Sequence, residues 1–302
     1  MSGEAGLDVS MKIKELFKEK PLITVELDHE LEKALATMNE HKISWVPVVD
    51  DRGEFTGSID FIDVLYHTLS LLQIYALLDI WKYRETDLSC IRNFKIKVRE
   101  VMETKKTVPH RSEASFDTIS WDQSFGEVLN KFCETKKHRF LLEDPRSILA
   151  QSDIVHLIAR TLSDSYGEAD IEDYLEEQPK LVIMSGSQST LEAIIMIAKE
   201  KVSCIGIVDE FGVLIRNFSA SDIKSFHIAD FSSLLLPIKD FLDIFCTKPL
   251  IKIYASATFS KSMHCLVDNK VHRIWRVDLE GKPVGVITLT DFLIAFSKLI
   301  KK

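Results

Sequence analysis

Two His-Arg pairs, His138-Arg139 and His272-Arg273, are the residues of this 302-residue chain best suited to bind an anion. The arginine guanidinium offers a planar fork of N–H donors, and histidine adds a donor that titrates near neutral pH. An isolated pair of this kind usually marks a solvated strand end. Here both pairs precede an aspartate at a similar distance, 15 residues before Asp153 and 19 before Asp291, which favours a binding role.

Four aspartates share one local setting: Asp63, Asp153, Asp222 and Asp291 each lie where a helix is expected to begin. A side-chain oxygen at that place can accept from the unpaired amide N–H groups of the first turn, so helix capping explains any one of them alone. A cap can equally be Ser, Asn or Gly. Four carboxylates in register therefore favour a role in binding as well.

An internal repeat places these residues in register. Residues 202–223 lie over 271–292 without a gap, at an offset of 69 residues, and a fixed period of this kind indicates a repeat architecture. The same pattern recurs at 42–63. A weaker copy at 138–156 has its two aspartates 9 residues apart instead of 13, as expected for a shortened turn between two strands.

Each copy predicts the order β-α-β-β-α, and the fold class is α/β with α+β repeats. Apolar residues at helical spacing predict a buried helix face in two copies, namely Leu31, Leu35 and Met38 in one and Leu191, Ile195 and Ala198 in the other. The first strands are predicted at Leu22–Val25, Leu181–Met184 and Leu250–Tyr254. The middle strands are predicted at Trp45–Val49, Arg139–Leu142, Ile205–Val208 and Arg273–Val277.

Composition excludes several classes of protein. A net charge of −8 argues against broad nucleic-acid binding. The N-terminal residues lack the apolar core of a secretory signal, which predicts a cytoplasmic or nuclear protein. Charged and polar residues interrupt the apolar stretch Phe61–Trp81, so a buried helix is expected there and no membrane contact. Five cysteines without a CxxC pair predict no disulfide framework and no metal site.

No catalytic signature occurs in the chain, so we expect no enzyme and no required cofactor. His264 and Cys265 are adjacent, but neighbours on a helix point about 100° apart and do not face each other.

The repeats resemble cystathionine β-synthase (CBS) repeats, which pair into Bateman modules. Four copies in one chain resemble the γ subunit of AMP-activated protein kinase and the SNF1-related kinases. The most specific likeness is VHRIWRVD followed by GVITLTDFLIAF in the fourth copy, and KHRFLLED in the second repeats the His-Arg pair. The resemblance implies two modules in a flat, pseudo-symmetric disc, residues 1–163 (repeats at about 10–80 and 95–163) and 180–302 (repeats at about 180–230 and 235–302), joined by 164–179.

The resemblance also implies AMP, ADP or ATP as ligands. It gives the ribose role to Asp63, Asp153, Asp222 and Asp291. An acceptor-only carboxylate suits the two hydroxyl groups of a ribose, and the adjacent helix start favours a phosphate. It gives the phosphate role to His138, Arg139, His272, Arg273, Ser203, Thr288, Thr290, Ser219 and Ser221.

Three departures from the family pattern stand out. Asp60 occupies the place of the usual Ser or Thr in the first copy, where a second carboxylate would repel a phosphate. The second copy reads Ala150-Gln151-Ser152-Asp153 and lacks the leading hydroxyl. Gly206 stands in the third copy where the family usually has Pro.

The resemblance predicts a regulatory subunit that senses adenine nucleotides within a kinase heterotrimer, with a catalytic α subunit and a scaffold β subunit as partners. The alternative is a stand-alone adaptor of CBS pairs that controls another enzyme or acts as an interaction protein, with a different adenosyl ligand or none.

Overall fold

The computed structural model describes residues 7–77, 96–108, 117–143, 146–161, 168–175, 181–225, 231–246 and 248–300. Four mixed three-stranded sheets repeat along them, in the orders β1-β2-β3, β4-β5-β6, β7-β8-β9 and β10-β11-β12. In each sheet the first two strands are parallel and the last two are antiparallel. The predicted fold of four β-α-β-β-α repeats is therefore confirmed.

The strands follow the predicted pattern closely. The first and second repeats contain β1 (Val25–Glu26), β2 (Trp45–Val49), β3 (Phe55–Asp60), β4 (Thr118–Ile119), β5 (Arg139–Leu142) and β6 (Ser147–Ala150). The third and fourth contain β7 (Ile183–Ser185), β8 (Cys204–Val208), β9 (Leu214–Ser219), β10 (Lys252–Tyr254), β11 (Arg273–Val277) and β12 (Pro283–Thr288).

Helices separate and follow these strands. Those that precede or belong to the first two repeats are α1 (Ile13–Leu16), α2 (Leu31–Glu40), α3 (Phe61–Leu77), α5 (Val98–Thr107), α6 (Phe125–Thr135) and α7 (Gln151–Thr161). Those that precede or belong to the last two are η2 (Ile171–Tyr174), α9 (Thr190–Glu200), η3 (Ala220–Ser225), η4 (Phe231–Leu235), α10 (Ile238–Phe245), α11 (Phe259–Asp268) and α12 (Leu289–Leu299).

The aspartates that precede the hairpin turns have a structural role. Asp209 Oδ1 accepts from the amides of Phe211 and Val213, both at 2.9 Å. Asp278 makes the same two bonds in the fourth repeat, and Asp50 makes them in the first. In each turn a glycine adopts φ between +77° and +82°, a conformation that side chains with a Cβ disfavour. The Asp-x-x-Gly spacing is thus a local turn device.

Each pair of repeats exchanges its leading segments. Helix α1 precedes the first repeat but packs on the second, where the amide of Ile13 donates to the carbonyl of Gln123 at 3.0 Å. Helix α5 precedes the second repeat and packs on the first, through Val98 N to His29 O at 3.0 Å. Segments η2 and α10 do the same in the second pair. This exchange ties repeat 1 to repeat 2 and repeat 3 to repeat 4.

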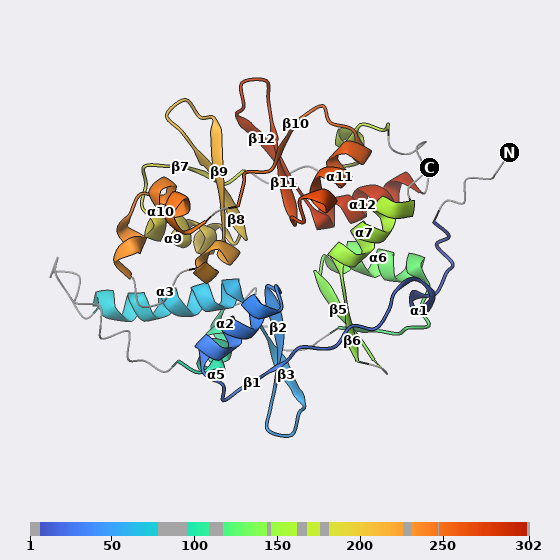
Figure 1. Ribbon diagram of the computed structural model, residues 1–302, viewed down its shortest axis with the longest axis horizontal. Helices are drawn as coiled ribbons and strands as arrows, with labels where there is room; N and C mark the ends of the chain where they lie inside the picture. The colour runs from blue at the N-terminus through green and yellow to red at the C-terminus, as the bar shows by residue number, and fades with distance from the viewer. Residues whose placement is uncertain are drawn as a thin grey trace.

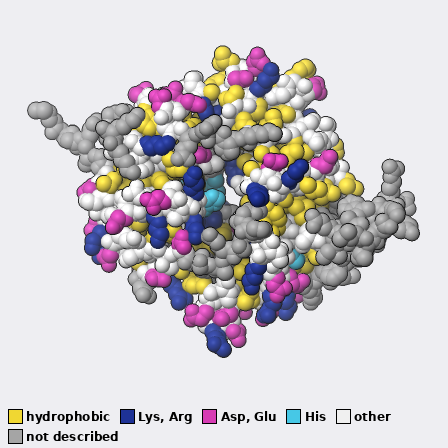
Figure 2. Space-filling view, turned by 180° about the vertical axis from the view of Figure 1, so that it is seen from behind, with side chains coloured by type: hydrophobic (Ala, Val, Ile, Leu, Met, Phe, Trp, Pro, Cys, Tyr) yellow, Lys and Arg dark blue, Asp and Glu magenta, His cyan; other side chains and the backbone are white. Residues whose placement is uncertain are grey.

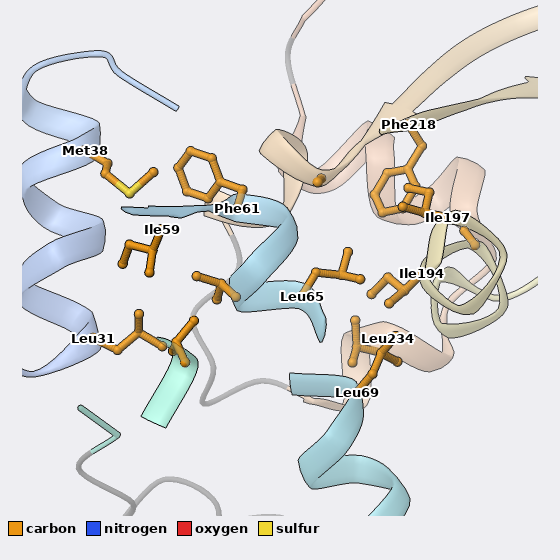
Figure 3. Packing of buried hydrophobic residues seen from close by; sticks show 14 of the residues in the cluster. Leu31, Met38, Ile59, Phe61, Leu65, Leu69, Ile194, Ile197, Phe218 and Leu234 are labelled. Atoms are coloured by element: carbon orange, nitrogen blue, oxygen red, sulfur yellow. The ribbon is translucent and has the colours of Figure 1, made fainter. Parts of the chain in front are cut away.

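The two pairs meet through helices and close a ring around a centre (Figure 1). One hydrophobic cluster joins repeats 1 and 3, where Leu65 and Leu69 of α3 point toward Ile194 of α9 and Leu234 of η4 (Figure 3). A second cluster joins repeats 2 and 4 through α7, α11 and α12. Viewed down its shortest axis, the molecule therefore runs in the order 1-2-4-3 around the ring.

Gly206 is explained by the contact between the third and fourth sheets. A Cβ at this position would lie 2.9 Å from Cη2 of Trp275, which is too close for any side chain. The Trp275 indole N–H donates to Asn217 Oδ1 at 2.9 Å, so the ring is held in place. A glycine is required here because the bulky indole of the fourth repeat fills the space.

Two details differ from the sequence-based expectation. On α9 the buried apolar side chains are Ala193, Ile194 and Ile197, while Ile195, predicted on the buried face, is 47% exposed. The core lies on a neighbouring stripe of the helix because the contacts with α3 select it. The third repeat begins its last helix as the 3₁₀ segment η3. Serines and β-branched residues in this segment have modest helix propensity.

Candidate functional site

A cavity of about 600 Å³ lies at the centre of the ring, with residues from all four repeats in its wall. Figure 2 shows it as a hollow with histidine and basic side chains around it. Ten of the predicted site residues line this wall: His138, Arg139, Ser203, Ser219, Ser221, Asp222, His272, Arg273, Thr288 and Thr290. The wall does not include Asp63, Asp153 or Asp291.

The cavity concentrates positive charge in an acidic protein. Burial and then the charges of four neighbours lower the pKa of His272 to about 4, the neighbours being Arg139, Arg273, His138 and Lys248. These basic groups come from the second repeat, the fourth repeat and the segment before the fourth. Their mutual repulsion is unfavourable unless an anion lies among them.

Arg273 has a buried hydrogen-bond donor for which the described residues provide no acceptor. Its Nη1 is buried and has no hydrogen-bond partner among the described residues. A buried donor without a partner costs on the order of 1–3 kcal/mol, and more for a charged group. Arg273 also lines the cavity, so its guanidinium is a candidate to bind an anion there.

Contacts with the first repeat fix the side chain of Arg139. Its Nη2 donates to Ser44 Oγ at 3.0 Å, and its guanidinium lies 5.3 Å from the centroid of the Trp45 ring. Burial lowers the pKa of Arg139, and the carboxylates of Asp60 and Asp153 oppose that shift. These contacts join repeats 1 and 2 and orient the guanidinium at the cavity wall.

The four motif aspartates all act in helix capping, through one of their two oxygens. In each copy Oδ2 accepts from the backbone N–H three residues earlier, at 2.8–2.9 Å. Only Asp222 also lines the cavity among the residues that the structure describes. The capping explanation is therefore sufficient for Asp63, Asp153 and Asp291, while Asp222 alone is placed to touch a ligand there.

Lysines neutralise three of these carboxylates. Asp63 pairs with Lys105 at 3.1 Å, and Asp222 pairs with Lys248 at 3.1 Å. Asp153 pairs with Lys20. Within the described part of the chain, Asp291 has no such ion pair, and its Oδ2 instead accepts from the Thr288 hydroxyl at 2.7 Å.

Several predicted hydroxyl groups already have partners. Ser219 Oγ donates to Asp222 Oδ2 at 2.7 Å and lies 2.9 Å from Ser221 Oγ. The Thr290 hydroxyl exchanges hydrogen bonds with the side-chain amide of Gln151, at 2.9 and 3.1 Å. The Gln151–Thr290 contact links repeats 2 and 4 across the cavity wall. These hydroxyls stabilise the wall, and Ser203 lies beside them.

Asp60 does not leave an uncompensated charge at the first repeat. Its Oδ1 accepts from the amides of Ile62 and Asp63 at 2.9 and 3.0 Å, so it caps α3. Its charge also stabilises the Arg139 cation. The departure from the family pattern therefore has a structural reason.

Sequence reasoning missed three lysines of the cavity wall: Lys42, Lys270 and Lys248. The first two had a signal in the repeat. Lys42, Lys136, Lys201 and Lys270 recur shortly before the middle strands, all with φ between 52° and 56°. Lys248 also has a signal, because Lys248-Pro249-Leu250-Ile251 repeats the KPLI of residues 20–23, and both lysines pair with a motif aspartate.

The wall also has an apolar part that could receive a flat base. It is formed by Ile43, Leu242, Pro249, Ile251, Val271 and Leu289. Pockets that combine such surface with a few convergent polar groups are typical of small-molecule sites.

Other kinds of site are not favoured by the described residues. No group of three or more His, Cys, Asp or Glu side chains among them could hold a metal ion. None of the helices described is both long enough and apolar enough to cross a bilayer. Burial raises the pKa of the Cys265 thiol, which disfavours the reactive thiolate.

Comparisons with known proteins agree with this architecture. The CBS domain model matches residues 13–69 and 238–298. Protein MJ1225 from Methanocaldococcus jannaschii, described as a candidate archaeal homologue of g-AMPK, matches with a TM-score of 0.70 over 95% of this chain and 100% of that chain, at 18% identity. This likeness shows the fold.

Two curated proteins are similar in sequence. Protein SDS23 of Kluyveromyces lactis is 22% identical over 93% of this chain and 61% of that protein, so the chain spans about three fifths of its length. The SNF1-related protein kinase regulatory subunit gamma-like PV42b of Arabidopsis thaliana is 29% identical over 26% of this chain and 26% of that protein. The chain therefore has a match to the CBS domain model near each end, and its four repeats have the fold of the full-length structural match.

Proposed function

We propose that this chain is a non-catalytic regulatory protein that binds an adenosine phosphate, AMP, ADP or ATP, in its central cavity. The observation that supports the proposal most is the buried, unpartnered Nη1 of Arg273 within a cluster of five basic groups. Phosphate carries the charge and the acceptor oxygens that such donors need.

The phosphates, the ribose and the base of the nucleotide would each contact a different part of the cavity wall. Phosphates would lie among Arg273, Arg139 and His272, with His138 beside them. The ribose would reach Asp222, the motif aspartate that lines the cavity. The base would contact the apolar wall formed by Ile43, Leu242, Pro249, Ile251, Val271 and Leu289. A cavity of about 600 Å³ falls within the usual range for such ligands.

Of the two kinds of regulator considered, the comparisons favour the stand-alone adaptor of CBS pairs. The similarity to SDS23 extends over 93% of the chain. The kinase heterotrimer is the second candidate, because the gamma-like PV42b is similar over a short segment. Purification from native expression separates the two: a co-purifying kinase α subunit with a β scaffold would support the second, and its absence would contradict it.

Calorimetric titration with AMP, ADP and ATP tests nucleotide binding. We expect saturable binding of at least one of them, and a weakening of about 10- to 150-fold in Arg273→Ala, because a charge-assisted hydrogen bond contributes about 1.5–3 kcal/mol. Arg99→Ala is the matched control, since Arg99 pairs with Asp28 on the surface. Unchanged affinity in a folded Arg273→Ala variant would contradict the phosphate assignment.

A further inference from the structure

Asp222 differs from the other motif aspartates because it combines a lysine partner, Lys248, with a place in the cavity wall. Asp222 is 5% exposed, and its Oδ2 is occupied by the amide and hydroxyl of Ser219. The other oxygen, Oδ1, accepts from Lys248 Nζ at 3.1 Å. A ribose hydroxyl that approaches this carboxylate from the cavity therefore competes with the lysine.

The lysine partners of the motif aspartates differ in burial: Lys105 at Asp63 is largely buried, whereas Lys20 at Asp153 and Lys248 at Asp222 are exposed. The Lys105 side chain is 11% exposed, and its ammonium also donates to the carbonyl of Ser58 at 2.7 Å. The Lys248 side chain is 58% exposed, and the carboxylate of Asp222 is its only ion-pair partner among the described residues. Lys105 is thus fixed in place, whereas Lys248 can move at the cost of one contact.

Lys248 also lies within the electrostatic field of the phosphate cluster. Its charge is one of the four that lower the pKa of His272, and its side chain lines the cavity. When it leaves Asp222, it can therefore reach an anion bound near His272 without crossing the molecule.

We propose that Lys248 makes ribose binding at Asp222 dependent on a phosphate, and so selects phosphorylated nucleosides over free nucleosides. In the empty cavity the ammonium neutralises Asp222. A nucleotide displaces it and offers a phosphate oxygen as its new partner, so the charge stays paired. A nucleoside also displaces the Lys248 ammonium but has no phosphate to pair with it. This inference rests on the proposed nucleotide function.

The test compares AMP and adenosine binding to the full chain and to Lys248→Met by calorimetry. In the variant, AMP loses a charge-assisted contact, whereas adenosine meets a carboxylate that no lysine occupies. We expect the ratio of AMP affinity to adenosine affinity to fall by at least about 10-fold. Asp222 keeps its Ser219 partners but loses its cation in this variant, so we expect a lower midpoint of thermal unfolding, and a cooperative transition checks that the variant is folded.

Lys270→Met is the matched control, because Lys270 lines the same cavity but makes no ion pair with Asp222 in the described structure. We expect it to weaken AMP without improving adenosine. Adenosine affinity that does not rise in Lys248→Met, with AMP still bound by the parent chain, would overturn the role of Lys248 alone. A parent chain that binds neither ligand would overturn the nucleotide function and this inference together.

Discussion

His272 shares the cavity wall with seven other basic side chains, and burial together with the charges of four of them decides its protonation. Burial and the charges of its neighbours lower its pKa from 6.5 to about 4. At neutral pH the imidazole is therefore uncharged in the empty cavity. It can still donate one N–H to a phosphate, and the negative charge of a bound phosphate would draw the proton back.

This shift predicts how stability depends on pH. Because the folded-state pKa lies below the unfolded value, the unfolded chain takes up the proton first as the pH falls. The contribution of neutral His272 to the free energy of unfolding is thus complete above about pH 6.5 and is lost as the pH falls toward 4. We expect ligand-free parent protein to lose more free energy of unfolding than His272→Gln over this range, measured by urea denaturation.

A shift from 6.5 to about 4 corresponds to roughly 3 kcal/mol at about 1.4 kcal/mol for each pKa unit. The expected difference is smaller than this, because water in the cavity screens the charges. His67 also has a pKa lowered by burial, but it is present in both proteins and cancels in the comparison. His264→Gln, an exposed site on α11, is the control and should follow the parent. Parallel curves for the parent and His272→Gln would contradict the pKa assignment.

Between elements, the contact of the third and fourth sheets depends on one small and one large residue. Gly206 on β8 leaves the space that the Trp275 ring on β11 fills, and Leu214 Cδ1 closes it from another side. The amide of Leu214 also donates to the carbonyl of Gly281 at 3.0 Å, so the two hairpins are joined by backbone as well. This contact holds Asn217 and Trp275 at the cavity wall.

Gly206→Ala should therefore lower the free energy of unfolding by about 1–3 kcal/mol, the usual cost of overpacking. In a Trp275→Leu background the smaller side chain leaves room for the added methyl group. The loss of free energy of unfolding caused by Gly206→Ala should therefore be smaller. A double-mutant cycle in urea measures this coupling.

Gly53→Ala is the control, because its Cβ would meet nothing within 4 Å. It should cost about 1–2 kcal/mol through its positive φ alone, with no dependence on Trp275. If Gly206→Ala costs the same in both backgrounds, the indole is not the reason for the glycine.

The whole molecule is closed by contacts of two kinds. Sheets and exchanged leading segments join repeats 1 with 2 and 3 with 4, while helices join 1 with 3 and 2 with 4. No pair can separate without exposing a hydrophobic cluster. The central cavity exists only when the ring is closed, since all four repeats contribute to its wall.

Two-domain proteins often unfold in two steps, but this ring should unfold in one. Calorimetry of the full chain is expected to show a single transition. Leu65→Ala, in the cluster between repeats 1 and 3, should lower the stability of the whole ring by about 2–5 kcal/mol. Ile195→Ala, on the exposed side of α9, is the control and should change it little. Two transitions, of which Leu65→Ala shifts only one, would show that the two pairs of repeats unfold independently.

The sequence alone determines the four repeats, their strand order and their turns, because these depend on residues close together in the chain. The hairpin aspartates bond to amides two and four residues away, and the motif aspartates bond to the amide three residues before. Similar local sequence therefore produces the same motif-aspartate bond in all four copies and the same hairpin bonds in the first, third and fourth.

Only the tertiary structure decides which of these similar residues line the central cavity. Asp222 lines the cavity while Asp63, Asp153 and Asp291 do not, although all four cap a helix in the same way. Lys248 pairs with a carboxylate 26 residues away, and Arg273 keeps a buried donor because of the basic groups brought around it. Identical motifs acquire different surroundings when four repeats close around one centre, and those surroundings depend on contacts between distant segments that no local pattern encodes.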